Sequence, residues 1–156
     1  MRAVLRFFML LALVVWVGGI IFFAFVVAPA LFSILPAREL AGRVVAHSIA
    51  ALHAMGIVAA VVFVLAATLE ARLQPQVRGA GVKIVLVLAM LVLTLASQLG
   101  VTPRMERLHS EMGAVDSVAA NDPRRAEFDR LHRWSTALES GVLLLGLATL
   151  ACVARE

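Results

Sequence analysis

The sequence predicts an all-α, polytopic membrane protein: a bundle of four membrane-spanning helices forming a single integral membrane domain over residues 1–156. The chain is 62% hydrophobic with a mean hydropathy of +0.98, whereas soluble domains are about 45–50% apolar. Four apolar stretches cover residues 4–35, 44–70, 82–102 and 131–153. Each is as long as the roughly 20 residues that carry a helix across a ~30 Å hydrocarbon layer. Because lipid offers no hydrogen-bond partners, the spans must bury their polar groups against one another.

The first span carries four residues that indicate helix packing. Gly18 and Gly19 allow a neighbouring backbone to approach, and Trp16 lies mid-span as a bulky packing residue. Pro29 removes the hydrogen bond to the Phe25 carbonyl, which predicts a kink near the end of the helix. The stretch is far longer than the roughly 7–15 apolar residues of a signal peptide, so we interpret it as a retained membrane helix.

The second span is rich in small residues, which predicts tight helix packing. These residues are Ala46, Ala50, Ala54, Gly56, Ala59 and Ala60. Residues 37–43 and 70–81 are predicted to be the linkers on either side of this span. The third span is followed by a polar region in which residues 104–120 are predicted to form an amphipathic helix. Asp122 is a candidate N-cap for the last helix, with Pro123 at its first position.

The net charge of +4 indicates contact with lipid and not with nucleic acid. The basic residues fall at helix ends and in loops, where they meet lipid headgroups. Arg2 and Arg6 flank the first span closely and favour a cytoplasmic N-terminus. Lys83 is the only lysine, and this bias toward arginine, with abundant Ala, Val, Leu and Gly, indicates a bacterial inner-membrane protein. Cys152 is the only cysteine, so no disulfide within the chain is expected.

Polar residues within the spans gather toward one side of the membrane. They are His53 in the second span, Gln98 at the end of the third, and His132, Ser135 and Glu139 at the start of the fourth. The opposite half of the bundle is almost purely aliphatic. We therefore expect one polar mouth, lined by these residues, and one apolar base.

Glu139 is the strongest single functional candidate. A carboxyl group roughly two turns inside a membrane helix is costly, and such residues usually face the bundle interior and mark function. His132, Ser135 and Glu139 are spaced i, i+3, i+7 and share a helix face. The alternative is that Glu139 only links helices, by staying protonated or by pairing with a neighbouring Arg or His.

His53 has three functional interpretations: metal ligand, haem ligand or proton relay. The structural alternative is an interhelical hydrogen bond to Glu139 or Gln98. The spacing of the histidines gives no metal motif. His53 and His132 are weak candidates for a metal or haem pair, which would need His132 to enter the bilayer.

Short motifs in two parts of the sequence resemble known membrane families. The N-terminal part resembles the first helix of the transmembrane protein 205-like family, through Trp16-Val-Gly-Gly, Phe22-Phe23, Val27-Ala-Pro-Ala-Leu-Phe32, Leu35-Pro36 and Ala41-Gly42. A later stretch is similar to the entry into that family's last helix, Phe128-Asp-Arg-Leu-His132-Arg-Trp-Ser135. This resemblance implies a four-helix integral membrane protein and no established activity. The start also looks distantly like CopD and HemJ-type membrane domains, but the first span lacks a histidine that a haem or copper site would use.

Three functional hypotheses follow, and none requires an enzyme. The first is a one-sided polar pocket that binds or passes a small cation or proton, or recognises a partner, with no cofactor. The second is a redox protein binding haem or copper through His53 and His132. The third is a structural subunit of a membrane complex or homo-oligomer, with the small-residue stripe of the second span exposed to lipid. Nucleotide-binding and hydrolase motifs are absent from the sequence.

Overall fold

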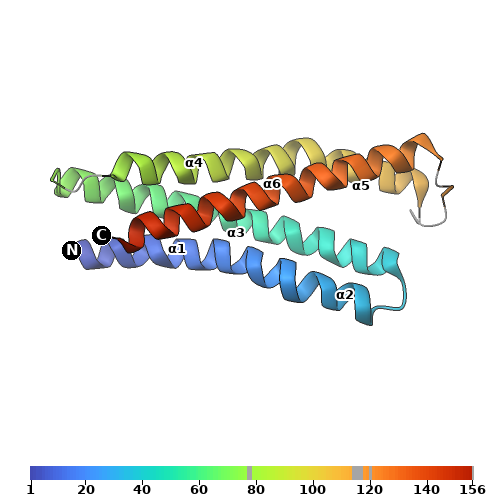
Figure 1. The fold of residues 1–156 in the computed structure, drawn as a ribbon, viewed down its shortest axis with the longest axis horizontal. Coiled ribbons are helices and arrows are strands. Elements are labelled where there is room, and N and C mark those ends of the chain that lie inside the picture. The colour runs from blue at the N-terminus through green and yellow to red at the C-terminus, as the bar shows by residue number, and fades with distance from the viewer. Residues whose placement is uncertain (77–78, 114–117, 120, 156) are drawn as a thin grey trace.

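Four long helical spans run side by side in the computed structural model, which describes residues 1–76, 79–113, 118–119 and 121–155 (Figure 1). The spans are Arg2–Ile34, Arg38–Leu73, Ala80–Met112 and Pro123–Ala154, each long and apolar enough to cross a membrane. The described residues contain no strand. The predicted four-helix membrane bundle is therefore confirmed.

The helices are arranged as a ring of neighbours. α1 (Arg2–Phe22) and α4 (Ala80–Ala96) each pack against both α3 (Arg38–Leu73) and α6 (Pro123–Ala154). Both termini lie at one end of the bundle, together with the connection between α3 and α4 (Figure 1). This end is called the terminal end below. The other end, called the loop end, holds the α3 start and the connection between α5 and α6.

Two spans contain a π-helical turn shortly before a proline. η1 (Phe23–Val27) precedes α2 (Ala28–Ile34), and η2 (Ser97–Val101) precedes α5 (Thr102–Met112). Pro29 and Pro103 are the second residues of α2 and α5. The Ala28 N–H donates to the Phe23 carbonyl and the Thr102 N–H donates to the Ser97 carbonyl, each five residues back. The wider turn lets the chain pass a residue that has no N–H. Near Pro29, α2 packs against α3 and slopes away from α6 (Figure 1).

Several predicted boundaries differ from the structure. The first linker is shorter than expected because α3 already begins at Arg38, and at its other end α3 continues to Leu73. The helix predicted over 104–120 ends at Met112, because Gly113 adopts a positive φ of 69° that terminates it. Residues 114–117 and 120 lie outside the described residues. Asp122 caps α6 by accepting from the Arg124 N–H at 2.8 Å, and hydrogen bonds from the Arg124 side chain and backbone hold the pKa of Asp122 below its usual value.

The core depends on one close contact between α1 and α3. Trp16 is buried, and its indole lies on the backbone of Gly56. Of the two glycines in α1, Gly19 lies against Leu52, with 2.8 Å between Leu52 Cδ1 and the position of an added Cβ. Gly18 is exposed, and an added Cβ would meet open space there. The structure therefore gives Gly18 no part in helix packing.

The small-residue stripe of α3 is divided between the interior and the surface. Gly56, Ala59 and Ala60 are buried inside the bundle, whereas Ala46 and Ala54 are exposed. The buried part holds α3 close to α1 and is not available to a partner. This arrangement weakens the argument for a structural subunit that docks through the stripe.

The contact between Trp16 and Gly56 predicts a position-specific loss of stability. In Gly56→Ala, the new Cβ would lie 2.6 Å from Cε2 of the Trp16 indole. Overpacking of this kind costs about 1–3 kcal/mol. The free energy of unfolding, measured by titration with sodium dodecyl sulfate and circular dichroism, should fall by that amount. Gly18→Ala is the matched control and should lose nothing; equal losses in both variants would contradict the packing assignment.

Candidate functional site

Three of the five pocket candidates meet in the interior, near the middle of the three spans that carry them. His53 comes from α3, Gln98 from η2 and Glu139 from α6. His53 Nδ1 lies 2.8 Å from Gln98 Oε1, and His53 Nε2 lies 3.1 Å from Glu139 Oε2. The side chain of His53 is 2% exposed and that of Glu139 is 25% exposed. A single imidazole thus joins three helices, with each ring nitrogen in a hydrogen bond.

The three elements place these side chains for local reasons. Leu52, His53, Gly56, Ala59 and Ala60 form the buried face of α3, so His53 points into the bundle. On α6, Val142 and Gly146 continue the same face as Glu139, at spacings i+3 and i+7. Gln98 is the second residue of the π-helical turn. Such turns are frequent at functional sites, because they alter the direction of the side chains on a helix.

Two buried hydroxyl groups lie close to Gln98 in the sequence, Thr94 one turn before it and Ser97 directly before it. Thr94 and Ser97 are each 1% exposed, and neither hydroxyl has a hydrogen-bond partner. Other buried hydroxyls of the spans behave differently: Thr149 Oγ1, for example, donates to the Leu145 carbonyl at 2.8 Å. Unsatisfied buried polar groups are rare, and they often mark places where water binds. The interior beside Gln98 therefore has hydrogen-bonding capacity that the described residues do not use.

The other two candidates do not join this cluster. His132 is exposed and Ser135 is half-buried on α6, on the loop side of Glu139. Within the residues that the structure describes, no group of three or more His, Cys, Asp or Glu side chains is placed to hold a metal ion. Both nitrogens of His53 already have hydrogen-bond partners. A haem or copper ligand at His53 would therefore have to replace one of them.

The terminal end is not the purely apolar base that the sequence indicated. Lys83 Nζ donates to Glu70 Oε2 at 3.1 Å, and both side chains are 1% exposed. Arg2 Nε lies 4.0 Å from Glu70 Oε1. The expectation of an apolar base is therefore wrong, because the end of α3 and the start of α4 bury a charged pair between them.

A helical pattern in the sequence could have revealed this pair. Glu70 follows Phe63, Ala66 and Ala67 at helical spacing, and these are core residues of α3. Lys83 precedes Val87 and Met90 on the buried face of α4. Both residues lie near the ends of their spans, where charged residues are ordinary, so only the helical spacing distinguishes them as members of the core faces.

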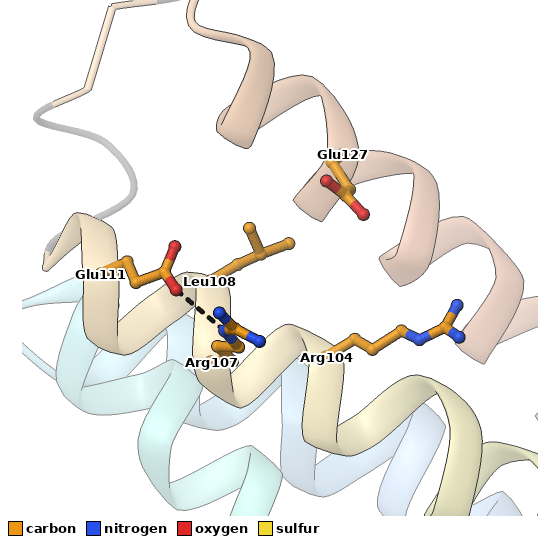
Figure 2. A pocket seen from close by; sticks show the side chains of 5 residues that line it. All are labelled: Arg104, Arg107, Leu108, Glu111 and Glu127. Carbon is orange, nitrogen blue, oxygen red and sulfur yellow. Dashed lines mark hydrogen bonds and ion pairs between the residues drawn. The ribbon is translucent and has the colours of Figure 1, made fainter.

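A surface hollow of about 340 Å³ lies between α5 and α6 at the loop end (Figure 2). Arg104, Arg107, Leu108 and Glu111 line it from α5, and Glu127 lines it from α6. Arg107 Nε donates to Glu111 Oε1 at 3.0 Å. The charges of opposite sign largely offset one another, so we assign no ligand to this hollow.

The fold and the site together define a class of protein: a four-helix integral membrane protein with a buried polar cluster. The sequence model of a domain of unknown function, DUF4149, matches residues 11–114. This match covers well over half of the chain, which therefore belongs to the DUF4149 family. It includes His53 and Gln98 and ends before Glu139. It does not name the transmembrane protein 205-like, CopD or HemJ families, so those resemblances stay predictions. No curated protein and no solved structure matches the chain.

The pair of Glu70 and Lys83 predicts a strong coupling between two substitutions. Lys83→Met leaves a buried carboxylate without its closest partner, and breaking a buried pair costs about 3–5 kcal/mol. Replacing both residues, as Glu70→Leu with Lys83→Met, removes both charges and should restore most of that loss. Unfolding free energies of the single and double variants measure the coupling. If the two losses simply add, the residues do not act as a pair.

Proposed function

We propose that this chain is a multi-pass protein of the bacterial inner membrane, with a cytoplasmic N-terminus, that binds a proton at the cluster of His53, Gln98 and Glu139. The observation that carries the proposal is the imidazole held between an amide and a carboxyl group inside the bundle. Histidine changes its charge closer to neutral pH than any other side chain. Intramembrane carboxyl groups commonly belong to proton pathways.

The cluster has two fully hydrogen-bonded arrangements that differ by one proton. With the Gln98 carbonyl oxygen facing Nδ1, as the structure has it, Nδ1 carries a hydrogen. One further proton is then shared between Nε2 and Glu139. If the Gln98 amide turns over, its NH₂ group donates to Nδ1, and Nε2–H donates to the Glu139 carboxylate. The extra proton leaves, and no ring nitrogen loses its hydrogen bond.

The exposure of the two acid–base groups suggests an order of events. Glu139 is partly accessible, whereas His53 is almost fully enclosed. A proton would therefore enter through Glu139 and pass to His53 across their 3.1 Å contact. The unpartnered hydroxyls of Thr94 and Ser97, close to Gln98 in the sequence, supply places for water.

An apolar layer separates this cluster from the terminal end. Trp16, Phe63, Met90 and Val142 are fully buried between the two polar clusters. Along α3, His53 and Glu70 are 17 residues apart, about 25 Å at 1.5 Å per residue. This packing favours binding of a proton from one side over a continuous path across the bilayer. Passage would need a second arrangement of the helices.

A redox function through haem or copper has less support in this geometry. The proposed ligands differ in environment, because His53 is buried in two hydrogen bonds and His132 is exposed. A metal at His53 would displace either Gln98 or Glu139. An absorption spectrum of the protein purified in mild detergent, with metal analysis, tests this alternative directly.

Infrared difference spectroscopy during a pH titration tests proton binding. The chain has ten carboxyl side chains, and one of the titrating carboxyl bands of the protein in lipid nanodiscs should disappear in Glu139→Gln. A titrating imidazole band should disappear in His53→Ala. Glu127→Gln is the matched control, because Glu127 lies on the same helix, is about half exposed and lies outside the cluster.

Two outcomes of the titration would sink the proposal. One is a wild-type spectrum in which Glu139→Gln removes no titrating band. The other is loss of the same band in Glu127→Gln. Proton uptake by reconstituted liposomes, followed with a trapped pH dye, then separates binding alone from passage. If liposomes with the wild type take up protons no faster than empty liposomes, while the Glu139 band titrates, the protein binds a proton and does not pass it across the bilayer.

A further inference from the structure

A second hollow lies on the outer face of α1 at the terminal end. It measures about 480 Å³ and is lined by Arg2, Ala3, Arg6, Phe7 and Leu10. We call this hollow the arginine groove. These residues are spaced i, i+1, i+4, i+5 and i+8, so they form one stripe along the first turns of the helix. The arginine groove shares no residue with the cluster proposed to bind a proton.

The groove has a polar end and an apolar end. α1 enters the membrane from Arg2, so the two guanidinium groups lie nearest the headgroup region. Phe7 and Leu10 lie deeper, and Leu10 is about 12 Å from Arg2 along the helix axis at 1.5 Å per residue. Phe7 is largely exposed at the outer surface of the bundle, where lipid chains pack. This order of charged and apolar groups matches the order of a lipid headgroup and its acyl chain.

Arg6 is fixed in place and retains unused donor capacity. Its Nη2 donates to the Ala154 carbonyl at 3.1 Å, close to the C-terminal end of α6. Its Nε is buried and has no hydrogen-bond partner. Leaving a buried charged donor unsatisfied is costly. A phosphate oxygen suits such a donor, because guanidinium groups bind phosphate with strong, charge-assisted hydrogen bonds.

The charge of the surroundings selects an anionic lipid. None of the residues that line the groove is acidic. Glu70 is buried in the interior, where Lys83 Nζ lies 3.1 Å from Oε2 and Arg2 Nε lies 4.0 Å from Oε1, and Arg72 and Arg155 add exposed positive charge at the same end. A zwitterionic headgroup would bring an ammonium group with no acidic partner in the groove. Anionic lipids gain about 1 kcal/mol per nearby basic residue.

We propose that the arginine groove binds the headgroup phosphate of an anionic phospholipid in the leaflet that faces the chain termini. Arg2 and Arg6 hold the phosphate, and Phe7 and Leu10 contact the upper part of an acyl chain. The bound lipid fills the hollow beside the start of α1 and supplies an acceptor for Arg6.

Native mass spectrometry of the full chain, released from micelles that contain equal amounts of phosphatidylglycerol and phosphatidylcholine, tests this site. The wild type should retain one phosphatidylglycerol in preference to phosphatidylcholine. The double variant Arg2→Gln with Arg6→Gln should lose that preference by about thirtyfold, from two basic contacts. The double variant Arg72→Gln with Arg155→Gln removes the same charge from the same end and should keep the preference.

A single substitution keeps the test decisive if the double arginine variant does not fold. Ala3→Glu places a carboxylate in the groove at an exposed position beside Arg2, near the headgroup region, and it should repel the anionic headgroup. If the groove variant and the double variant of Arg72 and Arg155 lose the lipid preference equally, net charge explains that preference and the proposal is overturned. Equal retention of the two lipids by the wild type would overturn it as well.

Discussion

The structure depends on a constraint set by its solvent: hydrocarbon cannot hydrogen-bond to protein, so every polar group within a span needs a partner inside the bundle. His53 meets this constraint with two partners on two other helices. Glu70 and Lys83 meet it by pairing. Hydroxyls such as Thr149 meet it within their own helix. The unpartnered hydroxyls of Thr94 and Ser97 are therefore informative, since they lie beside the cluster that we propose exchanges a proton.

The two polar clusters differ in what their chemistry permits. The pair of Glu70 and Lys83 is fully enclosed and has opposite charges, so it is suited to holding the α3–α4 hairpin together. The cluster of His53, Gln98 and Glu139 contains a partly accessible carboxyl group and an amide that offers either a donor or an acceptor. It can change its proton content and keep its hydrogen bonds. Position in the same bundle thus does not imply the same role.

Much of the fold follows from the sequence because hydropathy over long windows reports directly on membrane spans. The four spans were predictable in this way, and the Asp122 cap was predictable from an aspartate directly before a proline. The meeting of His53 with Gln98 and Glu139 was one of several alternatives, since the sequence shows which residues share a membrane side and not how helices rotate about their axes. The π-helical turns, the end of α5 at Gly113 and the burial of Lys83 arise from backbone geometry and tertiary packing. Amino-acid composition and hydropathy do not report on backbone geometry or on how the helices pack.

The buried pair at the α3–α4 hairpin has a consequence for how the chain enters the membrane during synthesis. Alone, a charged residue costs about 2.5–3.5 kcal/mol at the centre of a spanning segment on insertion scales, which is an upper bound for Glu70 and Lys83 near the ends of theirs. Glu70 and Lys83 are separated by only 13 residues and bind each other. If α3 and α4 enter the bilayer together as a hairpin, Glu70 and Lys83 enter it as an ion pair, and each charge offsets the other. We therefore expect the translocation machinery to release α3 and α4 together, with α3 retained until Lys83 has emerged from the ribosome.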